Sequence, residues 1–273
     1  MLKIKTLVIV VILTVLALLL AGMFTLALAD YREDFARTLP LKAGDVFALE
    51  NVNGRVTVVT WKESKVEIKA VKVARDDEKD LKDVEIRVDE SSGTVAVKAI
   101  WPKFRRNFQV RVDFDVKVPE GVNLKKVETV NGNVEATGVF ASAELETTNG
   151  SVTADGVKGT LDVSTTNGEI KVARHEGKLT AGTTNGGIRL EKLVFKDGIR
   201  AETTNGSITL AIDAPDQVNA SLRAETTNGH ISVDFPVTLK NLRQSRRLIE
   251  AQVGQGGPEI SLHTTNGSIT ITK

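Results

Sequence analysis

The stretch Thr147-Thr148-Asn149-Gly150 decides the fold, because the same four residues return along the second half of the chain. Measured from one Asn-Gly to the next, starting at Asn131, the steps are 18, 18, 18, 20, 23 and 38 residues. A fixed period this short is typical of repeat architectures, in which each unit stacks on its neighbours. The last step is about two ordinary ones, so we expect one degenerate unit inside it. The other copies are Thr165–Gly168, Thr183–Gly186, Thr203–Gly206, Thr226–Gly229 and Thr264–Gly267, with the variant Thr129–Gly132 ahead of them.

Apolar and polar residues alternate on both sides of each tetrad. In the unit around Asn167, Leu161 and Val163 precede the asparagine, and Ile170 and Val172 follow it at the same spacing as in the other units. Period-two alternation with one apolar face predicts strands that bury one side. Each unit is therefore expected to be a strand, an Asn-Gly corner and a second strand.

Two folds satisfy such a unit. Asn-Gly between alternating runs is a signal for a type I′ hairpin, whose central residues need positive φ, and repeated hairpins would give an antiparallel meander. In a β-solenoid each unit is instead one coil, and equivalent positions stack ~4.8 Å apart. The hairpin leaves the two threonines unexplained, whereas stacked coils bring inward threonines and asparagines within hydrogen-bonding reach from rung to rung.

We therefore predict an all-β fold, a β-solenoid resembling a single-stranded β-helix, with rungs of about 18 residues. Its structural ladder should consist of the asparagine of every copy and the first threonine of every full copy. These residues are Asn131, Asn149, Asn167, Asn185, Asn205, Asn228, Asn266, Thr147, Thr165, Thr183, Thr203, Thr226 and Thr264.

Residues 1–29 are predicted to be an export signal. Lys3 and Lys5 precede a long apolar run, and Ala27-Leu28-Ala29 fits a small-x-small cleavage site before Asp30. The run is also long enough to span a bilayer, so residues 1–29 are predicted to be either a signal peptide or a transmembrane anchor. Either alternative places the β domain outside the cytoplasm: in the periplasm, at the cell surface or anchored to the membrane.

Composition narrows the classes of partner. Without Lys3 and Lys5, 34 of the 36 basic residues remain against 35 acidic ones, and this balance argues against nucleic-acid binding. The chain has no cysteine, so an exported form has no disulfides and must be stabilised by its core. Aromatic residues make up only 4%, which fits a narrow interior filled by aliphatic side chains.

The chain divides into three parts. Residues 30–126 are predicted to form a less regular β region that begins or caps the solenoid, because the tetrad is missing there apart from a first copy of the unit at Glu50–Val58. Residues 127–273 form the regular repeat, interrupted by an insertion at 239–252. An open coil end is an exposed sheet edge, so a cap is expected.

The insertion is a candidate binding segment. It could be a loop leaving the coil or a short amphipathic strand, and insertions into repeats often lie on a functional face. Its possible binding residues are Arg243, Arg246 and Arg247. The final unit ends at Lys273 with little sequence for a cap, so the last edge is either guarded by Lys273 and the insertion or pairs end to end with another copy.

The repeated Thr-Thr-Asn-Gly-x-Ile units, the copy at Glu50–Val58, the strand end Lys117-Val118-Pro119 and the leader together resemble the bacterial exported "putative adhesin" families, over about Phe35 to Lys273. The resemblance implies a β-helical domain of unassigned chemistry that faces the cell envelope. It implies adhesion or envelope-stress sensing as roles and carries over no catalytic residues.

Paired carboxylates raise the alternative of a carbohydrate-active enzyme, a lyase or hydrolase on a β-helix. Glu128 with Glu146, and Glu202 with Glu225, occupy equivalent outward positions in consecutive units, and stacked neighbours could approach the separation that glycosidases use. Arginines two residues upstream would neutralise the second pair.

An ordered polymer or ice could instead match the row of outward threonines, such as Thr148 and Thr166.

The favoured prediction is a non-catalytic exported cell-envelope protein, an adhesin-like scaffold or binding module for an envelope or extracellular protein or polysaccharide. No cofactor is predicted. His175, His230 and His263 share no ligand spacing, so no metal site is predicted.

Overall fold

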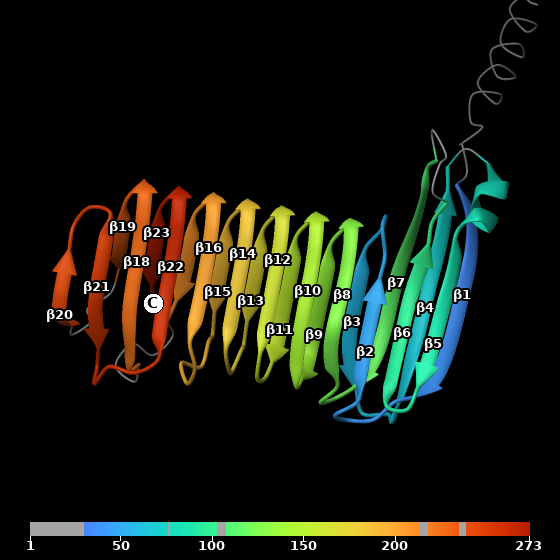
Figure 1. Cartoon of the computed structure of the whole chain (residues 1–273), viewed down its shortest axis with the longest axis horizontal. Helices are drawn as coiled ribbons and strands as arrows, with labels where there is room; N and C mark the ends of the chain where they lie inside the picture. The colour runs from blue at the N-terminus through green and yellow to red at the C-terminus, as the bar shows by residue number, and fades with distance from the viewer. Residues whose placement is uncertain (1–29, 76, 103–107, 213–217, 235–238) are drawn as a thin grey trace, which may run out of the picture.

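The computed structural model describes residues 30–75, 77–102, 108–212, 218–234 and 239–273. The predicted leader, residues 1–29, lies outside this part of the chain. Within the described part, no helix has both the length and the apolar character needed to cross a membrane. The described chain is an elongated all-β rod made of two long sheets (Figure 1).

Sheet A has 11 strands in the described residues. Their spatial order is β1 (Tyr31–Pro40), β4 (Lys65–Ala74), β7 (Val110–Pro119), β3 (Val56–Trp61), β9 (Val134–Phe140), β11 (Val152–Val157), β13 (Ile170–Ala173), β15 (Ile188–Glu191), β17 (Ile208–Ala211), β23 (Ile269–Thr272) and β19 (Ile231–Asp234).

Sheet B has 12 strands in the same part of the chain. Their order is β20 (Leu239–Gln244), β21 (Leu248–Val253), β18 (Ala220–Asn228), β22 (Glu259–Asn266), β16 (Ile199–Asn205), β14 (Leu179–Asn185), β12 (Leu161–Asn167), β10 (Ser142–Asn149), β8 (Asn123–Asn131), β2 (Val46–Glu50), β6 (Thr94–Ile100) and β5 (Glu85–Ser91).

Equivalent residues of successive units pair in parallel. Leu161 lies opposite Leu179, and Asn167 lies opposite Asn185, so the register follows the sequence repeat. The corner joins a strand of sheet B to a strand of sheet A and does not fold one strand back on its predecessor, which excludes the antiparallel meander. Two long parallel sheets with this register are consistent with a β-solenoid.

The predicted apolar face is the core. Leu161, Val163, Ile170 and Val172 are all fully buried, and the equivalent positions of neighbouring units are buried as well. Ile231, on the edge strand β19, is only partly buried. The stacked aliphatic columns therefore form one continuous interior along the rod.

Asparagine side chains form a one-directional ladder. Each donates from Nδ2 to Oδ1 of the asparagine on the next rung toward the N-terminal end of the rod, over distances of 2.7 to 2.9 Å. Asn53 of the first copy accepts at one end and Asn228 donates at the other. In order along the rod, the ladder runs through Asn53, Asn131, Asn149, Asn167, Asn185, Asn205, Asn266 and Asn228.

The glycine of the tetrad is required by close backbone approach. A Cβ on Gly168 would lie 1.9 Å from the carbonyl oxygen of Gly150 on the preceding rung, and the same conflict recurs along the column. None of the described tetrad asparagines has a positive φ, so the Asn-Gly pair does not form the I′ turn that this dipeptide favours in hairpins.

The first threonine of each tetrad donates a hydrogen bond to the glycine carbonyl oxygen of the neighbouring corner. Thr165 is 6% exposed, and its Oγ1 donates to the Gly150 oxygen at 2.9 Å. The other first threonines make the same bond over 2.8 to 3.2 Å. A buried carbonyl without a partner is costly, which gives the threonine column a physical reason.

The last repeat does not stack in sequence order, contrary to our expectation. Strand β22 lies between β16 and β18, and β23 lies between β17 and β19, so the final unit fills a rung between two earlier ones. The expected degenerate unit in the long step is also wrong. Strands β20 and β21 form an antiparallel hairpin on the outer edge of β18 (Figure 1).

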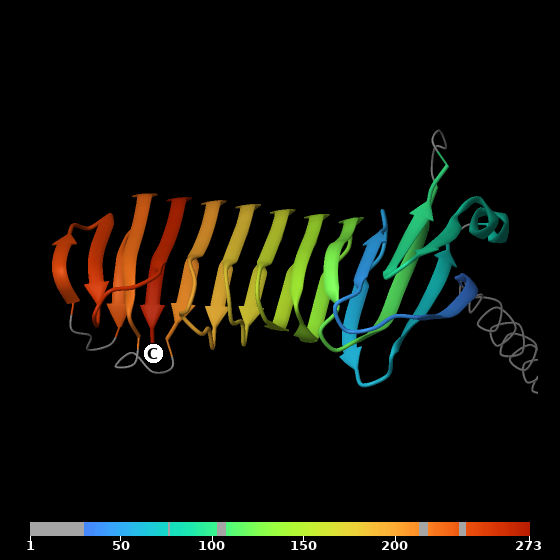
Figure 2. The same cartoon turned by 60° about the horizontal axis from the view of Figure 1, so that its bottom comes forward.

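The other end is covered by antiparallel strands. The first unit, β2 and β3, stacks directly on β8 and β9 although 78 residues separate Asn53 from Asn131. Strands β1 and β4 in sheet A and β5 in sheet B run antiparallel to their neighbours there, beside the short 3₁₀ helix η1 (Glu78–Asp83). Figure 2 shows this wider end opposite the β20–β21 hairpin.

His175 is a buried exception in the aliphatic interior. It lies at the turn after β13, is 1% exposed, and its Nδ1 lies 2.9 Å from the Val157 carbonyl oxygen. Its Nε2 has no partner in the described residues. Burial lowers the pKa of His175, while backbone hydrogen bonds, first that to Val157, and the charge of Asp197 act in the opposite direction.

The glycine corner can be tested with a matched pair of alanine variants. Gly168→Ala should lower the free energy of unfolding by about 3 kcal/mol or more, because a Cβ there meets backbone that has no room to move. Gly182→Ala should be neutral or stabilising by up to about 1 kcal/mol, since nothing lies within 4 Å of its Cβ position. Urea unfolding followed by circular dichroism measures both; equal losses would contradict the close-approach argument.

The buried histidine predicts a pH-dependent stability. Because its pKa is lowered in the folded state, the unfolded chain binds the proton more tightly. Stability should therefore fall as the pH drops below about 6.5, the ordinary pKa of histidine. In His175→Leu this contribution should vanish. Urea midpoints for both proteins on either side of that pH test the prediction, and an unchanged pH dependence in the variant would refute it.

Candidate functional site

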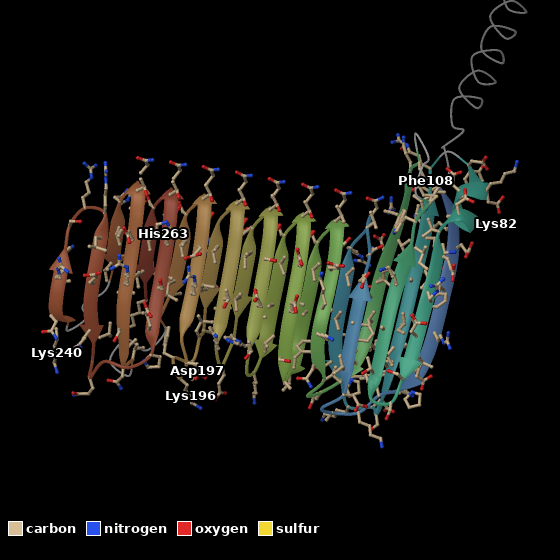
Figure 3. All side chains as sticks on the ribbon, viewed as in Figure 1. Lys82, Phe108, Lys196, Asp197, Lys240 and His263 are labelled. Atoms are coloured by element: carbon tan, nitrogen blue, oxygen red, sulfur yellow. The ribbon has the colours of Figure 1, made fainter. Side chains whose placement is uncertain are left out.

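The ladder edge presents the second threonine of each tetrad. Thr148, Thr166, Thr184 and Thr204 are exposed beside the asparagines, and Thr265 is half-buried. Figure 3 shows polar side chains standing along the edge at which the parallel strands of sheet B end. These threonines form a regular row that is one residue wide. The neighbouring outward position on each rung, three residues before the asparagine, holds no threonine.

The candidate glutamates of the outer face take part in ion pairs. Glu128 and Glu146 do lie on neighbouring rungs. Lys126 sits beside both, with Nζ 2.8 Å from Glu128 and 3.8 Å from Glu146. Its hydrogen bond to Glu128 raises the pKa of Lys126, so the amine stays charged and holds both carboxylates.

The second carboxylate pair is not a pair in space, which corrects the sequence interpretation. His263 lies between Glu202 and Glu225 because β22 is inserted between their strands. Figure 3 labels His263 on this strand. Each glutamate instead meets the arginine of its own strand, Arg200 at 2.6 Å and Arg223 at 2.7 Å. Neither arrangement leaves a free acid and a free base facing one another across a cleft.

A shallow open depression lies on the same face. Its lining includes Ser164 and Gly182, where two small residues interrupt the column of glutamates, together with Glu202 and His263. Sequence reasoning noted the interruption but not the depression or the neighbouring histidine. Only the inserted last rung brings His263 beside Glu202.

The β20–β21 hairpin carries a cluster of cations that we call the basic tip: Lys240, Arg243, Arg246 and Arg247. All four are exposed. Arg243 lies 3.3 Å from Glu250, which also pairs with Arg223. In the described part of the chain, no ion pair holds Lys240, Arg246 or Arg247, so the tip keeps a positive surplus.

The outer edge of the tip is unsuited to further strand pairing. The register of β20 against β21 shifts between Lys240 and Arg243, and Asn241 there has a φ of 53°. A bulge and cationic side chains on an edge strand discourage the addition of another strand. The hairpin thus ends sheet B while exposing charge at the extremity of the rod (Figure 1).

The three histidines lie in different environments. His175 is in the core, and His263 is on the outer face of sheet B. His230 follows a corner, and its Nδ1 lies 3.0 Å from Ser268 Oγ. Among the described residues, no three potential metal ligands lie together.

Comparisons with known proteins give a family. A search of curated proteins finds no match. A putative adhesin from Bacteroides fragilis NCTC 9343 is similar at 12% identity and a TM-score of 0.37, covering 88% of this chain and 96% of that one. A putative adhesin from Parabacteroides merdae ATCC 43184 is similar at 14% identity and a TM-score of 0.37, covering 88% and 97%.

A putative cell adhesion protein from Clostridium sporogenes ATCC 15579 is similar at 12% identity and a TM-score of 0.35, covering 88% of this chain and 99% of that one. The family model described as Toastrack DUF4097 matches residues 37–272, nearly the whole described rod. The chain therefore belongs to the Toastrack DUF4097 family.

Proposed function

We propose that this protein is a non-catalytic, exported binding module of the cell envelope, and that its basic tip binds an anionic polymer. The observation that carries the proposal is the position of Lys240, Arg243, Arg246 and Arg247 at the end of the rod opposite its N-terminal strands (Figure 2). A leader attached at β1 would leave this end farthest from the point of attachment.

The electrostatics support an anionic ligand. The tip gathers four exposed cations on one hairpin, with Glu250 as the carboxylate that pairs within it. Several cations on the outer faces lie at ion-pair distance from a carboxylate, as Lys126 and Arg200 do. A surplus of one sign at an exposed end raises the local concentration of oppositely charged ligands.

An exposed hairpin suits binding by surface contact. A linear polymer can lie across an exposed hairpin without being enclosed, and repeated charges on the polymer compensate for weak individual contacts. Export, adhesion and a link to envelope stress remain parts of this proposal. Export is supported by the apolar leader, and adhesion and a link to envelope stress are what the resemblance of the repeat to the putative adhesin families implies.

Binding through the tip can be measured with the purified full chain and polygalacturonate as an anionic polysaccharide, with dextran as the neutral comparison. The triple variant Arg243→Gln, Arg246→Gln, Arg247→Gln should bind polygalacturonate at least about tenfold more weakly, since each surface charge contact contributes roughly 1 kcal/mol. Added salt should weaken the wild-type complex.

The matched control removes three arginines elsewhere: Arg87→Gln, Arg111→Gln, Arg189→Gln. Each belongs to an exposed ion pair away from the tip, and this control should bind like the wild type. Equal losses in both triple variants, or stronger binding to duplex DNA than to the polysaccharide, would contradict the proposal. Polymer cleavage that disappears in Glu202→Gln would overturn its non-catalytic part.

Export can be tested in cells with an epitope at the C-terminus. The full chain should be found outside the cytoplasm, and a variant lacking residues 1–29 should stay inside. N-terminal sequencing separates the two forms of the leader, because cleavage leaves Asp30 first. A full chain that remains cytoplasmic would refute the proposed location without bearing on polymer binding.

A further inference from the structure

Each Asn-Gly pair in this chain carries a latent intramolecular reaction. The backbone nitrogen of a glycine can attack the side-chain Cγ of the preceding asparagine, and glycine allows this most readily because it has no Cβ to obstruct the approach. The reaction needs a glycine N–H that is not held elsewhere and an asparagine side chain free to move. The fold decides which pairs meet these conditions.

At most of the Asn-Gly pairs, stacking holds the glycine N–H in a hydrogen bond, so the nitrogen is not free to attack. In each, the glycine N–H donates to the backbone oxygen of the asparagine on the next rung toward the β18 end: Gly150 to Asn167 at 2.9 Å, for example. The same bond is made by Gly54, Gly132, Gly168, Gly186, Gly206 and Gly267, over 2.8 to 3.1 Å.

The rung at the β18 end has no successor to supply that acceptor. Gly267 donates to the Asn228 oxygen at 3.1 Å, so Asn228 and Gly229 form the last corner of the column. In the described part of the chain, the Gly229 N–H has no hydrogen-bond partner. Strand β21 covers β18 only as far as Thr226, whose N–H donates to the Arg247 oxygen at 3.0 Å.

The side chain of the last asparagine is also held less firmly. An internal residue such as Asn185 both donates and accepts an amide hydrogen bond in the ladder. Asn228 donates to Asn266 at 2.9 Å, and in the described residues its own Oδ1 accepts none. It is exposed to solvent, as the reaction requires.

We propose that Asn228-Gly229 is a site of spontaneous deamidation, the one tetrad that the fold leaves reactive. The Gly229 nitrogen loses its proton to solvent and forms a bond to Asn228 Cγ. The bond from Cγ to Nδ2 breaks, and the amide nitrogen leaves as ammonia with a proton taken from water. Water then opens the resulting succinimide ring and yields aspartate or isoaspartate at position 228.

The product changes both the ladder and the tip. A carboxylate at position 228 has no N–H to donate, so Asn266 Oδ1 loses its partner from this rung. The new negative charge arises two residues from Thr226, which is bonded to Arg247 of the basic tip. The new carboxylate slowly lowers the net positive charge around the tip. Only the effect of this change on polymer binding rests on the proposed function.

The test is a time course with the folded full chain at mildly alkaline pH. Peptides from an acidic digest are analysed by mass spectrometry, and isoaspartate is labelled with an isoaspartyl methyltransferase. Asn228 should deamidate at least about tenfold faster than each of the other asparagines of the ladder, because those sites must first open locally and break more hydrogen bonds. In urea, where the same dipeptides are all unprotected, the rates should converge.

Asn228→Gln should remove the fast signal, and the matched Asn266→Gln variant should keep it. Rates for Asn228 that equal those of the internal sites in the folded chain, or a spread of rates that survives unfolding, would overturn the proposal. The polygalacturonate assay on the aged protein is a separate readout. Fast deamidation without any change in binding would leave the modification site intact and remove only its connection to the tip.

Discussion

The structure depends on how closely one backbone corner can lie over the next. The carbonyl oxygen of each tetrad glycine occupies the space where a Cβ of the following tetrad glycine would stand, 1.9 to 2.0 Å away from that position. Only glycine permits such stacking, and the strands on either side of the corner inherit their register from it. The threonine hydroxyl then satisfies the same oxygen, as Thr165 does for Gly150. This close contact thus explains two of the four residues of the repeated tetrad, the glycine and the first threonine.

The hydrogen bonds of the corner give the rod a direction. Asparagine side chains donate toward the first rung at Asn53, whereas glycine N–H groups donate toward the last at Asn228. Every internal rung both donates and accepts these two kinds of hydrogen bond, whereas the first and last rungs each lack a neighbour on one side. The first end is covered by antiparallel strands and η1, and the last by a hairpin that stops short of the corner. The Gly229 N–H, without a partner in the described residues, and the cations of the basic tip both lie at the last end.

The two outer faces and the two ends have different capacities. On the described faces, the glutamates considered as candidate acids are held in ion pairs, as Glu128 is by Lys126. At the β20–β21 end, an edge strand that is bulged near Asn241 carries cations that the described residues do not neutralise. The proposed binding at the tip rests on this difference between the cations of the hairpin and the ion-paired carboxylates of the faces.

The sequence alone determined the repeat and its buried face, because both depend on residue types that recur at a fixed spacing. It favoured the parallel register, since a hairpin leaves the threonines unexplained. It also indicated that threonine and asparagine columns would lie between rungs. It did not determine which rung neighbours which. The tetrads that begin at Thr203, Thr226 and Thr264 are identical, so any of them fits beside any other, and the tetrads carry no information about their order. Only the tertiary structure decided that the final unit lies between the previous two, which separates Glu202 from Glu225 and makes Asn228 the end of the ladder.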